Sequence, residues 1–152
     1  MIYFDSAYLV KFYLNEAGHD RIVALAEEAG AVGSSLMARG ETVLAFHRKW
    51  REGALAAGGF REVIAQFEED CDAGLWTFYP LSDSLFAVFA TECTRMPRSV
   101  FLRTADAIHL VTARQQGFRS IYSSDRHLLA AAPHFGLRGL DILAQPGHPD
   151  EP

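Results

Sequence analysis

The chain has 152 residues, 49% of them hydrophobic, and a formal net charge of −5 at neutral pH. This composition suits one domain with its own core and excludes a disordered chain. No apolar run approaches the ~20 residues of a membrane-spanning helix, and no signal peptide is recognisable. We therefore expect a cytoplasmic protein, with Cys71 and Cys93 as buried free thiols. The acidic balance argues mildly against nucleic-acid binding, although a cation site would itself contribute acids.

The hydrophobic pattern predicts strands that alternate with helices. In chain order, the first half is predicted as a strand over 1–4, a helix capped by Ser6, a helix over 19–28 that Gly30 stops, a strand over 31–35, a helix from Ser34 or Ser35 to Gly53, and a helix that opens at Phe60 after a break at Gly58–Gly59. The second half is predicted as a strand over 75–81, a helix from Ser82 or Asp83 to Met96, a helix from Arg103 to Gly117, a strand over 119–123, a short helix over 128–132, and a strand over 137–143.

This alternation predicts an α/β fold, a three-layer α/β/α domain with a mostly parallel central sheet and helices on both faces. We expect a single domain over residues 1–143. The remaining residues, 144–152, are rich in Pro, Gly and acids, and we expect them to form a flexible tail.

The stretch over 103–111 is unusual because it places a carboxylate in a helix that is apolar on nearly every side. Its apolar members are Ala105, Ala107, Ile108, Leu110 and Val111. Asp106 occupies the first turn of this predicted helix, where burial without a partner would be costly. A helix N-terminus, an Arg or a metal ion is needed to offset that cost.

Three more acids interrupt apolar surroundings. Asp5 and Asp125 each follow a predicted strand, and Glu41 lies in the first two turns of the helix after 31–35. Ligand sites in parallel sheets form at the carboxyl ends of strands, so these acids and Asp106 can converge. Four gathered carboxylates repel one another unless cations are present, and Mg²⁺ or Mn²⁺ suits an all-oxygen site. Such a site can activate water and stabilise charge on a phosphodiester.

Each acid also has a purely structural interpretation. Asp5 and Asp125 could cap the helices that follow them, Glu41 could pair with Arg39 or Arg48, and Asp106 could pair with Arg103. Basic residues near the acids could instead hold phosphates of a substrate. The candidates for that role are Lys11, Arg39, Arg103 and Arg126.

Four motifs in this order resemble a PIN-domain ribonuclease, most closely the VapC-type toxin of bacterial toxin–antitoxin pairs. They are Ile2-Tyr3-Phe4-Asp5-Ser6-Ala7, Ser34-Ser35-Leu36 leading to Glu41, Arg103-Thr104-Ala105-Asp106-Ala107-Ile108-His109-Leu110, and Tyr122-Ser123-Ser124-Asp125-Arg126-His127-Leu128. The resemblance covers residues 2–143. Gly40 departs from the aliphatic residue expected before the second acid.

The resemblance implies a metal-dependent endoribonuclease in which the four acids surround one or two Mg²⁺ or Mn²⁺ ions. The implied catalytic and metal-binding residues are Asp5, Glu41, Asp106 and Asp125. Ser6, where the family often has Thr, and Ser124 would support the site by orienting carboxylates or water, with Arg103 as the countercharge nearest Asp106.

The resemblance also implies a homodimer, an RNA substrate and a cognate antitoxin that covers the site. An apolar groove for the antitoxin could use Phe12, Phe46, Trp50 and Phe60, although each of these could equally be a core residue. His109 lies one turn from Asp106 on the same helix face. A general-acid role is possible, but we favour a packed histidine that is hydrogen-bonded inside the core.

Two other functions remain open. A haloacid-dehalogenase-like phosphatase also begins with a strand that ends in Asp, but its motif needs a second Asp where this chain has Ala7. A catalytically inert PIN-like scaffold would bind RNA or protein without cutting. The presence of all four acids argues against the scaffold, because a binding module has no need of the electrostatic repulsion between four gathered carboxylates.

Overall fold

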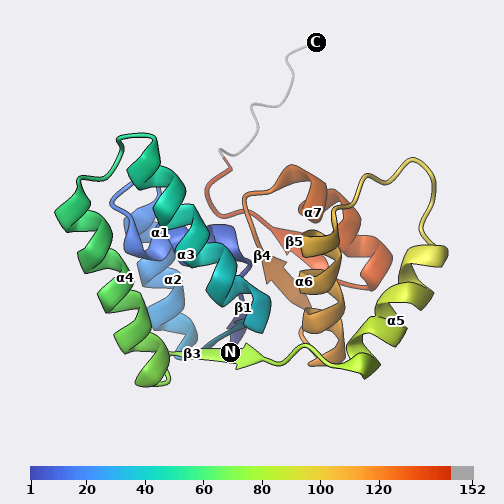
Figure 1. Cartoon of the computed structure of the whole chain (residues 1–152). Helices are drawn as coiled ribbons and strands as arrows, with labels where there is room; N and C mark the ends of the chain where they lie inside the picture. The colour runs from blue at the N-terminus through green and yellow to red at the C-terminus, as the bar shows by residue number, and fades with distance from the viewer. Residues whose placement is uncertain (145–152) are drawn as a thin grey trace, which may run out of the picture.

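The computed structural model describes residues 1–144. Five strands alternate with helices in the predicted order (Figure 1). The strands are β1 (Ile2–Tyr3), β2 (Val32–Ser35), β3 (Trp76–Tyr79), β4 (Ser120–Tyr122) and β5 (Arg138–Leu140). The helices are α1 (Ser6–Tyr13), α2 (His19–Ala29), α3 (Leu36–Arg51), α4 (Ala57–Asp72), α5 (Asp83–Thr94), α6 (Thr104–Gln115), α7 (Arg126–Ala131) and a 3-10 helix, η1 (Ala132–Phe135).

All described strand pairs are parallel. β1, β2 and β3 form one sheet with β2 in the middle, and β4 pairs with β5. A single bridge between Phe4 and Tyr122 joins the two sheets, and the Asp5 amide donates to the Tyr122 carbonyl at 3.1 Å. The strand order is therefore β3-β2-β1-β4-β5, which places the end of β1 beside the end of β4.

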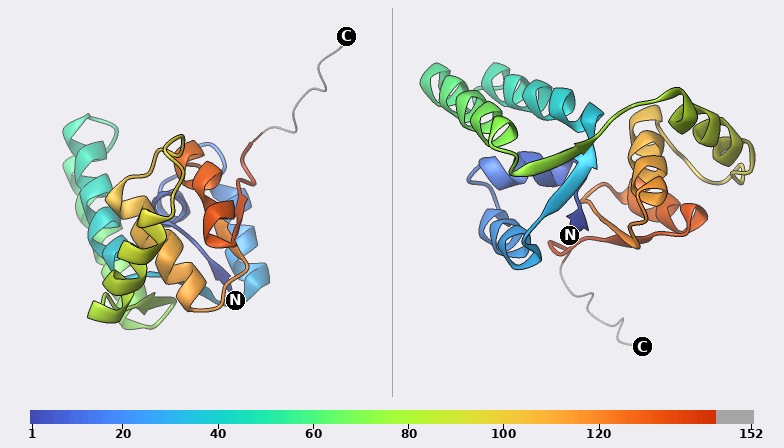
Figure 2. Two further views of the ribbon diagram at one scale, coloured as in Figure 1. Left: turned by 90° about the vertical axis from the view of Figure 1, so that its right-hand side faces the viewer. Right: turned by 90° about the horizontal axis from the view of Figure 1, so that it is seen from below.

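Adjacent residues of β1 face opposite sides of the sheet, as the pleat of a strand requires. Tyr3 lies in a core with Leu110 and Ile121, on the side of α5, α6 and α7. Phe4 lies in a second core with Leu9 and Phe46, on the side of α1 to α4. The two groups of helices stand on either side of the strands in Figure 2. The predicted three-layer α/β/α architecture is confirmed.

The helix ends follow local chemistry. The Ser35 side chain accepts a hydrogen bond from the Met37 amide at the start of α3, and Gly30 ends α2 in the left-handed conformation. The first helix is capped by Asp5, whereas Ser6 was the predicted cap. The predicted break at Gly58–Gly59 is wrong, because both glycines lie in the first turn of α4.

Other boundaries shift inward or fall outside the described part. The last strand covers Arg138–Leu140, which is shorter than the predicted 137–143. Pro133 falls in η1, so the chain keeps turning after α7 instead of ending its helical path there. Of the tail predicted over 144–152, all but Ala144 lies outside the described residues.

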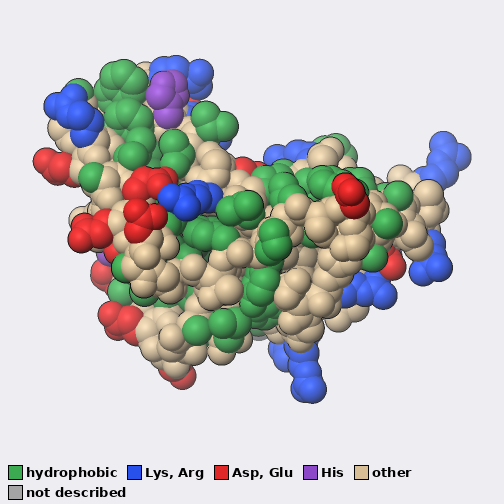
Figure 3. Space-filling model, turned by 60° about the horizontal axis from the view of Figure 1, so that its bottom comes forward, with side chains coloured by type: hydrophobic (Ala, Val, Ile, Leu, Met, Phe, Trp, Pro, Cys, Tyr) green, Lys and Arg blue, Asp and Glu red, His purple; other side chains and the backbone are tan. Residues whose placement is uncertain are grey.

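Several large hydrophobic side chains remain on the surface. Leu44 and Trp50 are exposed on α3, Phe86 on α5 and Phe101 before α6. On the face drawn in Figure 3, hydrophobic side chains run across the middle, while Lys and Arg stand mainly at the margin. Within residues 1–144, none of the helices combines the length and apolarity that crossing a membrane would require.

Candidate active site

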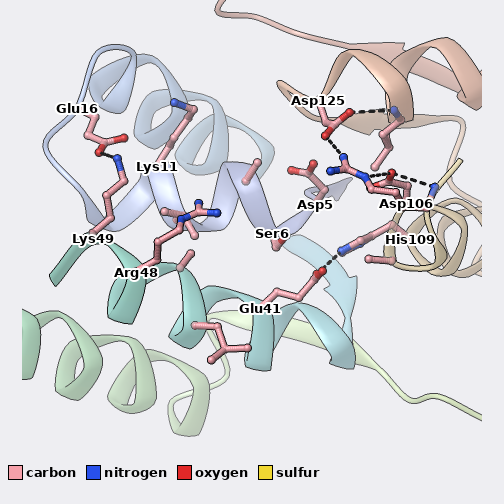
Figure 4. Close-up of a pocket in the computed structure, with 17 residues that line it drawn as sticks. Asp5, Ser6, Lys11, Glu16, Glu41, Arg48, Lys49, Asp106, His109 and Asp125 are labelled. Carbon is pink, nitrogen blue, oxygen red and sulfur yellow. Dashed lines mark hydrogen bonds and ion pairs between the residues drawn. The ribbon is translucent and has the colours of Figure 1, made fainter. Parts of the chain in front are cut away.

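The four predicted acids line one cavity of about 650 Å³ (Figure 4). Asp5 follows β1 and Asp125 lies just beyond β4, so the neighbouring parallel strands deliver both to the same sheet edge. Glu41 reaches the cavity from α3 and Asp106 from the first turn of α6. Segments up to 120 positions apart in sequence therefore meet here, as the acid pattern predicts.

Asp5 is the most deeply buried of these acids. Its side chain caps α1 by accepting from the Tyr8 amide at 3.0 Å, and the Ser123 hydroxyl donates to its other oxygen. Only 4% of the residue is exposed. Burial raises the pKa of Asp5 from 3.8 to about 6, and the nearby His109, the Ser123 hydroxyl and the Tyr8 amide offset only part of that increase.

Arg103 joins Asp106 to Asp125. Its Nε donates to Asp106 at 2.9 Å, and its Nη2 forms an ion pair with Asp125. Asp125 also caps α7, accepting from the amides of His127 at 2.8 Å and Leu128 at 3.2 Å. Partial burial acts to raise the pKa of Asp125, but the two amides and Arg103 together hold it below its ordinary value. The capping and the site interpretations of this acid are thus compatible.

Glu41 is connected to α6 through a histidine. His109 Nε2 lies 3.0 Å from the Glu41 carboxylate, and its Nδ1 lies 3.0 Å from the Tyr3 hydroxyl. His109 is 2% exposed, so it is the packed, hydrogen-bonded core histidine that we favoured. It also lines the cavity, which places a ring nitrogen beside one of the four acids.

The supporting residues are only partly those expected. Ser6 and Arg103 line the cavity. The hydroxyl that contacts the acids belongs to Ser123, which donates to Asp5 and accepts from the Asp125 amide at 2.8 Å. Ser124, the predicted residue, makes no hydrogen bond to these acids within the described chain. Successive side chains of an extended segment point to opposite sides, so only one of the two adjacent serines faces Asp5. That residue is Ser123, which is fully buried.

The basic residues of the cavity also differ from the predicted set. Arg39 pairs with Glu68 and Asp72 on the surface between α3 and α4. Arg126 is exposed and is not among the residues that line the cavity. Of the four predicted cations, only Lys11 and Arg103 face the cavity.

Arg48 and Lys49 complete the end of the cavity away from the acids, together with Lys11 (Figure 4). Lys49 forms an ion pair with Glu16, while Arg48 forms none within the described residues. The sequence contained a signal for both, because positions seven and eight residues after Glu41 lie on its helix face. The cavity thus has an acidic end, which suits a cation, and a basic end, which suits the phosphates of an anionic chain.

The donor set suits a hard divalent cation, because every predicted ligand is a carboxylate. Among residues 1–144, no three Asp, Glu, His or Cys side chains stand close enough to form a ready-made metal site. Arg103 and His109 explain this spacing, since each is hydrogen-bonded to acids of the cavity. The acids share one cavity but are held by protein partners.

The aromatic residues suggested for a groove divide into two groups. Phe46 is fully buried, and Phe12 packs edge-on against Trp76 with ring centroids 4.8 Å apart, so both serve the core. Trp50 and Phe60 stack at the outer ends of α3 and α4, with centroids 5.0 Å apart and an interplanar angle of 7°. Trp50 is exposed, whereas Phe60 is half-buried like Phe12.

Comparison with known proteins identifies the fold. The family model described as PIN domain matches residues 2–133. A chain in the structure of FitAB bound to an IR36 DNA fragment is similar, with a TM-score of 0.70, 16% identity, and coverage of 97% of this chain and 99% of that one. Mycobacterium tuberculosis VapC20, described as a Sarcin-Ricin loop cleaving toxin, has a TM-score of 0.65, 17% identity, and coverage of 86% and 95%. No curated protein matches the chain.

Proposed function

The chain belongs to the PIN domain family, and on this premise we propose that it is a metal-dependent endoribonuclease, the toxin of a type II toxin–antitoxin pair. The observation that carries the proposal is the meeting of Asp5, Glu41, Asp106 and Asp125 in one cavity. A structural role for each acid separately would not require them to share a cavity. The descriptions of the two structural neighbours, one a cleaving toxin, agree with this function.

The four acids would hold Mg²⁺ or Mn²⁺. When bound, such an ion supplies an activated water and stabilises the charge that develops on the phosphodiester. The protein's own groups do the rest. Ser123 orients Asp5, His109 orients Glu41, and Arg103 balances charge between Asp106 and Asp125.

The basic end of the cavity would bind the RNA backbone. Lys11 and Arg48 face the cavity without an ion pair in the described chain, so both are available to substrate phosphates. Lys49 is held by Glu16 and would contribute less. These contacts would position the strand across the acids, although the net charge of the whole chain is negative.

The partners follow from the same proposal. We propose a homodimer that works in the cytoplasm and is silenced by a cognate antitoxin. Trp50, stacked on Phe60, is the exposed residue of the suggested aromatic groove and is accessible to such a partner.

Cleavage of single-stranded RNA by the purified protein with Mg²⁺ or Mn²⁺ tests the function. We expect chelation by EDTA to stop cleavage, and Asp106→Asn to lower it by at least about a hundredfold. Asp20→Asn, on the exposed surface of α2, is the matched control and should cleave like the wild type. Cleavage that survives both EDTA and Asp106→Asn would rule out the metal mechanism.

Two alternative results would redirect the proposal. Hydrolysis of small phosphoesters without RNA cleavage would favour the dehalogenase-like phosphatase, although Ala7 occupies the position of its second Asp. RNA binding without cleavage under any divalent cation would favour the inert scaffold.

A further inference from the structure

Tyr3, His109 and Glu41 form a buried chain of hydrogen bonds that leads from the core to the cavity. The Tyr3 hydroxyl lies 3.0 Å from His109 Nδ1, and His109 Nε2 lies 3.0 Å from the Glu41 carboxylate. Tyr3 is 0% exposed and His109 2% exposed, whereas the Glu41 side chain is 29% exposed, so bulk water reaches only the end of this chain that faces the cavity. The chain ends at the acid whose reach into the site is hardest to predict from sequence.

The proton positions in this chain are constrained. Burial holds the pKa of Tyr3 far above its ordinary value, so its hydroxyl keeps its proton and is able both to donate and to accept. If His109 carried its proton on Nδ1 alone, Nε2 would present a lone pair to the Glu41 carboxylate, and the two would repel. In either remaining state of the ring Nε2 carries a proton, and Nε2–H donates to Glu41. With the proton on Nε2 alone, Tyr3 donates to Nδ1 and Nε2–H donates to Glu41.

We propose that Tyr3 is a positioning residue that holds the His109 ring with Nε2–H directed at Glu41 and thereby holds the Glu41 carboxylate in the cavity. An outer hydrogen-bond partner commonly sets the tautomer and orientation of a histidine in this way. Here the histidine presents its N–H to a carboxylate that the proposed function assigns to a metal ion. The proposal concerning Glu41 therefore rests on that function, whereas the orientation of the His109 ring does not.

Packing alone does not account for the Tyr3 hydroxyl. The Tyr3 ring packs edge-on against Phe118 with centroids 5.3 Å apart, a contact that phenylalanine would preserve. The hydroxyl adds a polar atom to a fully buried position, which is costly unless it is hydrogen-bonded. Tyr3→Phe therefore removes the hydrogen bond while it leaves the ring in place.

The tautomer can be read directly by long-range ¹⁵N–¹H NMR of the histidine rings. The chain has six histidines, and the signals that disappear in His109→Gln identify His109. We expect a protonated Nε2 in the wild type and changed ring signals in Tyr3→Phe. Tyr122→Phe is the matched control, because that hydroxyl makes no hydrogen bond in the described chain, and it should leave the pattern unchanged. A wild-type ring protonated on Nδ1 alone, or unchanged ring signals in Tyr3→Phe, would overturn the proposal.

Mn²⁺ binding, followed by electron paramagnetic resonance of the free ion, reads the effect on Glu41. Tyr3→Phe should weaken Mn²⁺ binding roughly tenfold, the loss typical when a ligand's outer partner is removed. His109→Gln should bind Mn²⁺ better than His109→Leu, since the glutamine amide can still donate to Glu41. Circular dichroism of each variant separates these effects from unfolding.

A double-mutant cycle then isolates the route. If Tyr3 acts only through the His109 ring, Tyr3→Phe in the His109→Gln background should change Mn²⁺ binding by less than about twofold. A full tenfold loss in that background would refute positioning through His109. A wild type that binds no Mn²⁺ and cleaves no RNA would instead refute the proposed function, and the NMR result would still decide the tautomer.

Discussion

Replacement of Asp5 by asparagine should stabilise the metal-free protein while it abolishes cleavage. Asparagine is as good a helix cap as aspartate, so the hydrogen bond from the Tyr8 amide can persist. The cost of keeping a charge at this buried position disappears. Because the pKa of Asp5 rises from 3.8 to about 6 on folding, a shift of about 2 units, the stabilisation at neutral pH is at most about 3 kcal/mol.

The sign of the pH dependence follows from the direction of this shift. Between about pH 4 and pH 6 the folded state holds the Asp5 proton more tightly than the unfolded chain does. The free energy of unfolding therefore falls as the pH rises through this range. The destabilisation by the buried Asp5 charge is complete above about pH 6. The advantage of Asp5→Asn over the wild type should thus be small at pH 4 and greatest above pH 6.

Urea denaturation at pH 4 and pH 7.5, with EDTA present, measures this difference. A gain of about 3 kcal/mol at pH 7.5 would raise the melting temperature by roughly 6–12 °C for a chain of this size. Asp20→Asn is exposed and should show no such pH-dependent gain. If Asp5→Asn were no more stable than the wild type at pH 7.5, or if its advantage did not grow with pH, the reasoning about burial would be refuted.

The remaining predictions concern the basic end and the packing. Arg48→Ala should raise KM for RNA and flatten the salt dependence of binding, by about 0.7 in the log–log slope, whereas Arg61→Ala, outside the cavity, should change neither. Gly139→Ala should destabilise the fold by about 1–3 kcal/mol in urea denaturation, because a Cβ would lie 3.0 Å from backbone atoms of α7. Gly40→Ala meets nothing within 4 Å in α3 and should stabilise by about 0.5–1 kcal/mol. Thr42→Val should raise stability by about 1 kcal/mol in the same assay, since the Thr42 hydroxyl is buried without a hydrogen-bond partner in the described chain.

The fold was predictable because the hydrophobic pattern of each segment agrees with the order of strands and helices along the chain. Short apolar runs alternate with amphipathic segments, and each strand delivers its last residue to the same edge. The failure at Gly58–Gly59 shows the limit of such signals. Two glycines disfavour a helix by about 1 kcal/mol each, but burial of Phe67 and other side chains of the same helix outweighs that cost.

The acids of the site were predictable for a different reason than its cations. A carboxylate in apolar surroundings is expensive, so its position in the sequence is informative. Arg48 and Lys49 lie on a polar helix end, where cations are common and indicate nothing by themselves. Their role emerges only when α3 packs beside α1. To identify Ser123 instead of Ser124 as the serine beside Asp5, the register of the preceding strand must be known.

The partners of the four acids explain how the chain can fold with so much negative charge in one cavity. Arg103 pairs with Asp106 and Asp125, and His109 donates to Glu41, so three of the acids have a basic residue as a direct partner. Within the described residues Asp5 is bonded only to a hydroxyl and an amide, and burial raises its pKa. No basic residue is a direct partner of Asp5 in the described chain, so a divalent cation that bound beside it would relieve an electrostatic cost of the folded site.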